Sequence, residues 1–208
     1  MKINEKVKNL ISRCKQKKVF LLISLVYNFV WSICKILFGF LTSAYYFCIS
    51  GVSTIMFGFS KRLYLKNFDN EIEKEKQAKA ITVSILIIIS GVFFTFYMAR
   101  LFFIDNSKTY GLIFSIAIAF FSFTELAISI YNFVKAKKRN DLLLKSLRGC
   151  SLASSCYAIT LTQVALLSAT NSTNNFYNAV TGVIFGSFVV LIGIYLLIDN
   201  SLNKKTKE

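Results

Sequence analysis

A single carboxylate interrupts one of the longest apolar stretches of this chain. Glu125 lies in FFSFTELAISIYNF, about 14 residues, or roughly 20 Å of helix, from the start of that stretch. If the stretch crosses a membrane, an ionised carboxylate there is costly and normally faces water or the interior of a helix bundle. Glu125 is therefore either a cation or proton site, or a structural carboxylate that is protonated or hydrogen-bonded to a neighbouring helix.

Two basic residues are candidate charge partners of Glu125. Lys35 and Arg100 lie near the ends of two other apolar stretches. Long basic side chains in such positions reach the lipid headgroups, and we favour this interpretation for both. Either side chain could instead turn inward toward Glu125, although both lie several residues nearer the membrane surface.

A stripe of small and hydroxyl-bearing residues runs through LRGCSLASSCYAITLTQ, residues 147–163. At about 100° per residue, a helix collects these side chains on one face. Leu152, Ile159 and Leu166 lie on the opposite face. The polar face carries Cys150, Ser151, Ser154, Ser155, Tyr157 and Thr162.

Segment 42–60 has a similar polar face, and Val52, Ile55 and Phe59 lie opposite it. The residues of this second face are Ser43, Tyr46, Ser50, Thr54 and Gly58. Such faces let helices approach closely and hydrogen-bond across the contact, which favours a packing role. The alternative is a polar transport pathway between the two helices. Its candidate residues are Glu125, Ser50, Thr54, Cys150, Ser154 and Tyr157.

The residue types needed for several other chemistries are missing. The chain has no histidine, and its five cysteines form no C-x-x-C pair, so no metal-ligand set is evident. It also has no paired carboxylates and no activated nucleophile with a base in reach. We therefore expect no enzymatic activity, no bound metal and no cofactor.

The elements that must position these residues are membrane helices. The chain is 55% hydrophobic, with 21 phenylalanines and no proline. Apolar stretches of about 20 residues recur, which is the length that spans a hydrocarbon core of roughly 30 Å. Each is expected to be a helix, because lipid offers no partners for backbone N–H and C=O groups. The six expected spans are 19–40, 42–60, 80–103, 111–134, 149–169 and 178–198.

The chain has a net charge of +15, and its positive charges are concentrated in particular segments. Lysine and arginine cluster before the first span, in linkers 61–79 and 135–148, and after the last span, whereas the three short linkers hold only Lys108. By the positive-inside rule, both termini then lie in the cytosol. The basic residues also suit the anionic lipids of the bilayer. Nucleic acid is not an expected partner, because no stacking motif accompanies them.

The expected organisation is a basic cytosolic segment at 1–18, a six-helix transmembrane domain at 19–199 and a short cytosolic tail at 200–208. The first of these segments has an amphipathic pattern. The short outer linkers predict three helical hairpins in an all-α, multi-pass protein of the cell membrane. A seam of small residues, Gly182, Gly186 and Gly193, favours helix packing and leaves a homodimer open.

Three segments carry a family resemblance. LVYNFVWSICKILFGFLTSAYYF contains Asn28, Lys35, Gly39 and the pair Thr42–Ser43. YNFVKAKKRNDLLLKSLRGCSLASSCYA joins a basic linker to the polar stripe, and NFYNAVTGVIFGSFVVLIGIYLLIDN follows as the last span. Together they resemble the first hairpin, the basic linker with its following helix, and the sixth helix of cation diffusion facilitators. That family exchanges divalent metals for protons.

The metal ligands that this resemblance implies are absent. An ungapped count places the family's ligand positions at Val52, Met56, Ala153 and Tyr157, and none of these is a good zinc ligand. A shifted register would use the polar faces instead, with Ser50 and Thr54 facing Cys150 and Ser154, which are weak ligands as well. Asn178 stands where the family often has an aspartate, and the family's C-terminal metal-binding domain does not follow.

The resemblance implies a transporter scaffold in which the second and fifth helices lie together at the centre. We expect an integral membrane protein that moves a cation, coupled to protons, or another small solute. The alternative on the same fold is a non-transporting membrane scaffold or accessory protein, since function lies in the site and not in the fold.

Overall fold

The computed structural model describes residues 19, 22–23, 25–37, 39–40, 45–66, 73–103, 111–138, 141–170 and 175–205. This part of the chain forms six helices and no strand, which confirms the expected all-α class. The first helix is Leu25–Leu37. It is followed by α2 (Tyr45–Lys66), α3 (Glu73–Arg100), α4 (Leu112–Lys137), α5 (Leu142–Ala169) and α6 (Asn175–Lys205). Segment 1–18, Thr42, Ser43 and the side chain of Tyr46 lie outside the described residues.

The helix surfaces are those of a chain embedded in apolar surroundings. Helices α3, α4, α5 and α6 are long and apolar enough to cross a membrane. Bulky apolar side chains point away from the bundle; Phe103 is 89% exposed and Ile113 is 86% exposed. Apolar surface on this scale is uncommon on soluble monomers. The helices are therefore consistent with a membrane-embedded protein.

The helix ends follow local chemistry. The Asp141 side chain caps α5 by accepting a 3.0 Å hydrogen bond from the Leu144 backbone N–H, which serves one of the unpaired N–H groups of the first turn. Because the chain lacks proline, no ring removes a backbone hydrogen bond inside a helix. The last helix continues through the expected boundary at 199 and ends at Lys205.

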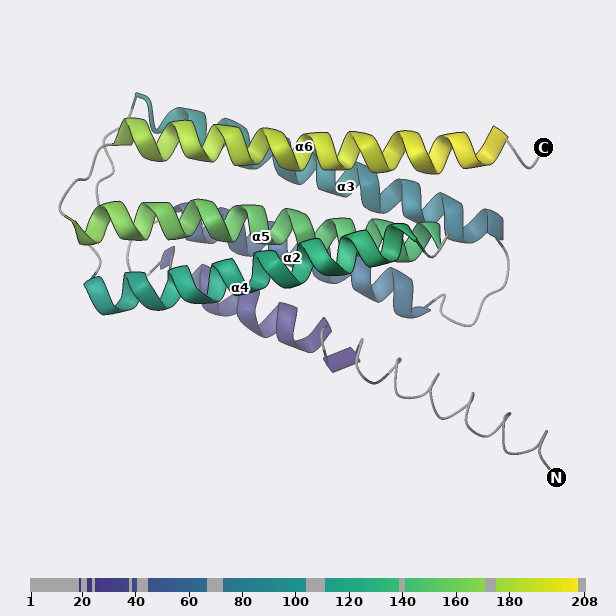
Figure 1. Cartoon of the computed structure of the whole chain (residues 1–208), viewed down its shortest axis with the longest axis horizontal. Coiled ribbons are helices and arrows are strands. Elements are labelled where there is room, and N and C mark those ends of the chain that lie inside the picture. The colour runs from purple at the N-terminus through teal and green to yellow at the C-terminus, as the bar shows by residue number, and fades with distance from the viewer. Residues whose placement is uncertain are drawn as a thin grey trace.

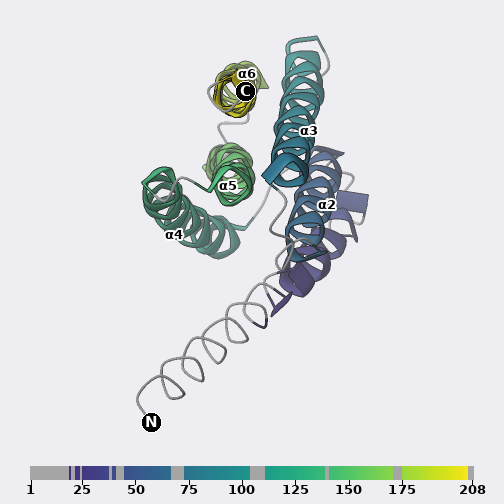
Figure 2. The same ribbon diagram turned by 90° about the vertical axis from the view of Figure 1, so that its right-hand side faces the viewer.

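The helices form two layers (Figures 1 and 2). One layer contains α4, α5 and α6, and the other contains the first helix, α2 and α3. The start of the first helix and the end of α6 lie at the same end of the bundle (Figure 1). The layers meet through contacts of α3 with α6 and of α5 with both α2 and α3.

The most extensive contact joins α3 to α6. Its basis is the glycine seam: Gly182, Gly186 and Gly193 lie against Met98, Thr95 and Ile88 of α3. A Cβ at Gly193 would lie 2.6 Å from Ile88 Cγ1, so only glycine permits this approach. The interpretation of the seam as helix packing within the chain is confirmed.

Helix α5 occupies the centre and contacts every other labelled helix. Its contact with α2 confirms that the second and fifth helices lie together. The sequence predicted that the third and fourth helices would pack as a hairpin. The structure does not show this hairpin, because α3 and α4 make no contact in the described part of the chain. Instead, the glycines draw α3 to α6, and α4 packs on α5.

A polar cluster ties three helices together at the end of the bundle where α6 stops. The Asn200 side chain donates to Ser84 Oγ of α3 at 3.1 Å and to Ser146 Oγ of α5 at 3.0 Å. Beside it, Lys145 Nζ lies 2.6 Å from Asp199 Oδ2. These contacts hold α3, α5 and α6 in one register.

Candidate functional site

A cavity of about 330 Å³ lies at one edge of the two layers, between the first helix, α2, α4 and α5. Its position follows from the packing, because α4 contacts α5 but makes no contact with α2 among the described residues. Most of its lining is apolar or aromatic: Trp31, Phe47, Ile118, Phe121, Ala158 and Leu161. The polar lining comes from Lys35, Ser122 and Glu125.

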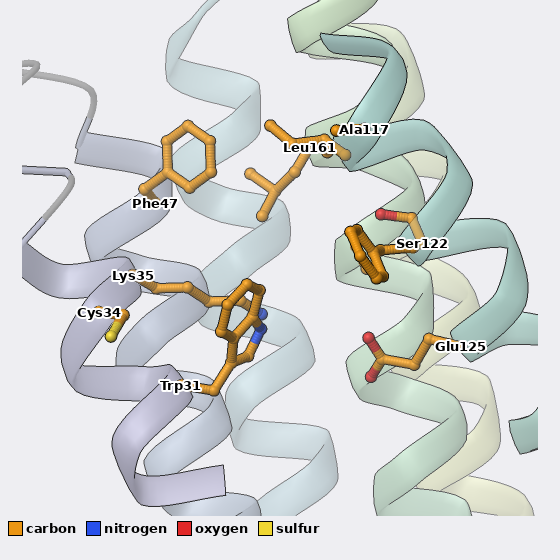
Figure 3. A pocket seen from close by; sticks show the side chains of 11 residues that line it. Trp31, Cys34, Lys35, Phe47, Ala117, Ser122, Glu125 and Leu161 are labelled. Atoms are coloured by element: carbon orange, nitrogen blue, oxygen red, sulfur yellow. The ribbon is translucent and has the colours of Figure 1, made fainter. Parts of the chain in front are cut away.

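Lys35 reaches from the first helix into this cavity (Figure 3). Its side chain is buried, with 8% exposure, so the favoured interpretation that it extends to the headgroups is wrong. The cavity gives the amine a polar destination inside the bundle, because Glu125 lines the same cavity. Arg100, the last residue of α3, is exposed and does not line the cavity.

Glu125 extends from the middle of α4 toward the same cavity (Figure 3). Its Oε1 accepts a 3.3 Å hydrogen bond from Ser154 Oγ of α5. Ser122, one turn earlier on α4, also lines the cavity. No ion pair within 4.0 Å joins Glu125 to Lys35, so the two charges face each other with space between them.

Further candidate residues lie between this site and the end of the bundle where α6 stops. Cys150, one turn from Ser154 on α5, is buried beside Ser60 and Lys61 of α2. Small polar groups therefore follow one another along α2 and α5, from the cavity to a second buried lysine.

The polar residues of α2 do not join those of α5 as expected. The register places Cys150 beside Ser60, about ten residues from Ser50, which is roughly 15 Å along a helix axis. Thr54 Oγ1 instead donates to the backbone oxygen of Ser50 at 2.8 Å. The Ser50 hydroxyl is buried and has no hydrogen-bond partner among the described residues.

Tyr157 lies in the core and not in the cavity. Its ring lies 4.3 Å from the ring of Phe94 and 6.2 Å from that of Phe57, between centroids. The hydroxyl shares a 2.9 Å hydrogen bond with Ser90. Phe57, Phe94 and Tyr157 fill the space between α2, α3 and α5, which closes this part of the expected pathway.

Two other hydroxyls of the α5 stripe, those of Ser155 and Thr162, are satisfied within their own helix. Ser155 Oγ donates to Leu152 O at 2.8 Å, and Thr162 Oγ1 donates to Ala158 O at 3.0 Å. Such bonds let a hydroxyl be buried without a partner on another helix. Within the stripe, the Ser154 hydroxyl is the one aimed at a charged side chain of a neighbouring helix.

Sequence reasoning missed Trp31 and Ser122 as parts of the site. A signal existed for both, because Trp31 precedes Lys35 by four residues and Ser122 precedes Glu125 by three. Residues at these spacings share one face of a helix. The cavity lies where these two faces meet.

The site has the wrong composition for a divalent metal. No group of three or more Cys, Asp or Glu side chains assembles among the residues that the structure describes. Val52, at a position that the resemblance assigns to a ligand, is 52% exposed on the outer face of α2. The nearby ammonium of Lys35 would also repel a cation bound by Glu125.

Comparison with protein-family models, with curated proteins and with solved structures finds no match to this chain. The chemistry of the cavity is therefore the main indication of function. That chemistry is a lysine and a glutamate of opposite charge, each on a different layer, within a largely apolar and aromatic lining.

Proposed function

We propose that this chain is a six-span protein of the cell membrane that carries a small solute through the cavity between Lys35 and Glu125. Four long apolar helices and the exposed apolar surface support membrane embedding. The alternation of basic and uncharged linkers supports cytosolic termini. The common end of the first helix and α6 is compatible with an even number of spans (Figure 1).

One observation carries the proposal: a charged pair lines a cavity where four helices meet. Ionisable groups at membrane depth are costly and usually mark a pathway for substrate or protons. Small-molecule sites are concave and mostly apolar, with a few polar groups that fix orientation. A cavity of about 330 Å³ falls at the lower end of the usual range for such sites.

The helix contacts suggest where the site opens. In the described part of the chain, α5 is the one labelled helix that α4 contacts, while α3, α5 and α6 are linked by glycine contacts and hydrogen bonds. A tilt of α4 away from the first helix would therefore leave these links intact and widen the cavity. Protonation of Glu125 would weaken its attraction to Lys35 and favour that motion, which gives a route to proton coupling.

The resemblance to cation diffusion facilitators supports the proposed six-span scaffold. Proton coupling through Glu125 would keep part of that family's chemistry without its metal site. The positive charge of Lys35 argues against a bare divalent cation as the solute.

A second candidate function is a membrane scaffold or accessory protein that transports nothing. The filled aromatic core at Tyr157 favours it, because a transport pathway between α2 and α5 would need space there. The cavity at the layer edge would then bind a ligand or a partner without moving it.

Flux measurements test the transport proposal. Protein in liposomes that enclose a pH-sensitive dye is challenged with monovalent cations, Zn²⁺, Mn²⁺, Co²⁺, Cd²⁺ and small organic solutes. We expect proton movement driven by a solute, lost in Glu125→Gln and kept in Glu75→Gln, which changes an exposed carboxylate of α3. Silence across the panel from folded protein would reject transport and favour the scaffold function. Equal flux in Glu125→Gln would return Glu125 to a structural role.

A further inference from the structure

The two charges of the cavity lie on facing helices and do not neutralise each other by contact. Lys35 is almost fully buried, yet no carboxylate lies within 4.0 Å of its amine among the described residues. Glu125 has its hydrogen bond from Ser154 and otherwise faces the cavity. A buried charge needs a partner, because desolvation without compensation is expensive. The space between the two groups is therefore suited to a ligand that partners both.

We infer that the cavity binds a small zwitterion, with the acidic group of the ligand on Lys35 and its ammonium on Glu125. This inference deepens the proposed function by naming the solute class. Binding itself does not require that the solute be transported.

Charge matching distinguishes this ligand from a metal ion or a simple amine. A cation on Glu125 alone would leave Lys35 unpaired and would repel it, and an anion on Lys35 alone would do the same to Glu125. A zwitterion satisfies both groups and adds no net charge to the cavity. Its two charged groups must point to different sides of the cavity, because Lys35 and Glu125 stand on opposite layers of the bundle (Figure 3).

The remaining lining indicates an apolar body for the ligand. Trp31, Phe47 and Phe121 supply aromatic surface beside the two charges. Aromatic faces also attract ammonium groups, so they support the same orientation. Ser122 places a hydroxyl one helical turn from Glu125, where it can hydrogen-bond to the ligand.

This chemistry has two sources in a cell. A free apolar amino acid carries the two charges in water, and phosphatidylethanolamine carries them as a headgroup in the bilayer. The lipid headgroup is included because α4 and the first helix expose apolar side chains beside the cavity. Trp31 and Phe121 are among these side chains. The two sources share the ammonium and the anion, and the test separates them.

The chain offers its own probe, because Trp31 is its single tryptophan and lines the cavity. Tryptophan fluorescence of the full chain in phosphatidylglycerol nanodiscs is titrated with leucine, with 3-methylbutylamine, with 4-methylpentanoate and with ZnCl₂. The amine and the acid each keep the apolar body of leucine and one of its charges. We expect a saturable change with leucine, and binding at least about tenfold weaker for each single-charge analogue.

Variants of Lys35 and Glu125 test which side chain binds which charged group of the ligand. Lys35→Met should abolish the preference for leucine over 3-methylbutylamine, and Glu125→Gln should abolish its preference over 4-methylpentanoate. The double variant Lys35→Glu with Glu125→Lys keeps both charges and should recover binding if either single variant folds poorly. Glu75→Gln is the control and should bind as the unchanged chain does, because its carboxylate lies on the exposed surface of α3.

A second series replaces phosphatidylglycerol stepwise with phosphatidylethanolamine. Displacement of leucine by this lipid, with an altered Trp31 spectrum, would assign the headgroup as the bound zwitterion. Unchanged leucine binding would assign the free amino acid. If the amine or Zn²⁺ binds as tightly as leucine, or if neither zwitterion binds, the inference is wrong. Zwitterion binding without flux would reject transport alone, and cation flux without zwitterion binding would reject the zwitterion alone.

Discussion

Replacement of Gly91 by alanine should destabilise the bundle through the contact between α3 and α6. A Cβ built at Gly91 lies 2.8 Å from Val190 Cγ2 and 3.0 Å from the Val190 backbone nitrogen. A side chain can rotate away from such a contact, whereas the backbone of α6 cannot. The two helices would therefore have to separate along their most extensive interface.

The magnitude follows from two opposing effects. Overpacking in a well-packed interior costs about 1–3 kcal/mol, and the higher helix propensity of alanine returns about 1 kcal/mol. Because the backbone contact places Gly91 in the upper part of the overpacking range, the net loss should be about 1–2 kcal/mol. For a chain of this length, that loss lowers the melting temperature by roughly 2–8 °C.

Gly58→Ala provides the matched control within α2. The nearest atoms to its added Cβ are carbons of the Phe29 ring, at 3.2 and 3.3 Å, and a small ring movement relieves that contact. This variant should keep or slightly raise the melting temperature, because alanine favours the helix.

Thermal unfolding in detergent, followed with a thiol-reactive dye, measures both variants. Cys150 and Cys156 are buried and become reactive only when the bundle opens, above a constant signal from exposed Cys34. Equal melting temperatures for Gly91→Ala and the unchanged chain would refute the argument. So would an equal loss in Gly58→Ala, because the difference between a backbone and a side-chain contact would then have no effect.

Other contacts give predictions of the same kind. Tyr157→Phe should lower the free energy of unfolding by about 1 kcal/mol, because it removes a buried hydrogen bond to Ser90; adding Ser90→Ala should recover most of the loss in the same thermal assay. Lys145→Met should cost about 1–2 kcal/mol by breaking a 2.6 Å ion pair between α5 and α6 whose acidic partner is partly exposed. Exposed Lys138→Met is the control, and equal melting temperatures for the two lysine variants would contradict the prediction. A cysteine placed between α5 and α6, at 171–174, should react with an impermeant maleimide outside intact cells, and labelling only after permeabilisation would invert the proposed topology.

The helices and their packing faces could be predicted from the sequence because both depend on local patterns. Long apolar stretches mark helices whatever their neighbours are. Gly182 and Gly186 mark a close contact because few residues are small enough for one. Even the outward face of α2, with exposed Val52 and Phe59, follows from helical periodicity.

The site could be predicted only in part, because it depends on which helices are neighbours. Glu125 was identifiable from its position within an apolar stretch. The direction of Lys35 was not, because a lysine near a helix end usually reaches the headgroups, and only its neighbours in the fold can turn it inward. The choice is decided by a cavity that forms where the first helix, α2, α4 and α5 come together. The register between α2 and α5 likewise depends on the packing of the whole bundle. It places Cys150 beside Ser60, away from Ser50.

The pairing of α3 with α6 also has a consequence for biosynthesis. These helices are separated in sequence by α4 and α5, so their contact forms only after the last span has left the ribosome. In the proposed membrane arrangement, α5, the least apolar of the four long helices, then lacks part of its set of neighbours. A nascent chain that stops before α6 would leave Gly91 of α3 and both Lys145 and Ser146 of α5 without their α6 contacts. We expect such truncated chains to be substrates for membrane quality control, and the complete chain to escape it only when α6 closes the bundle.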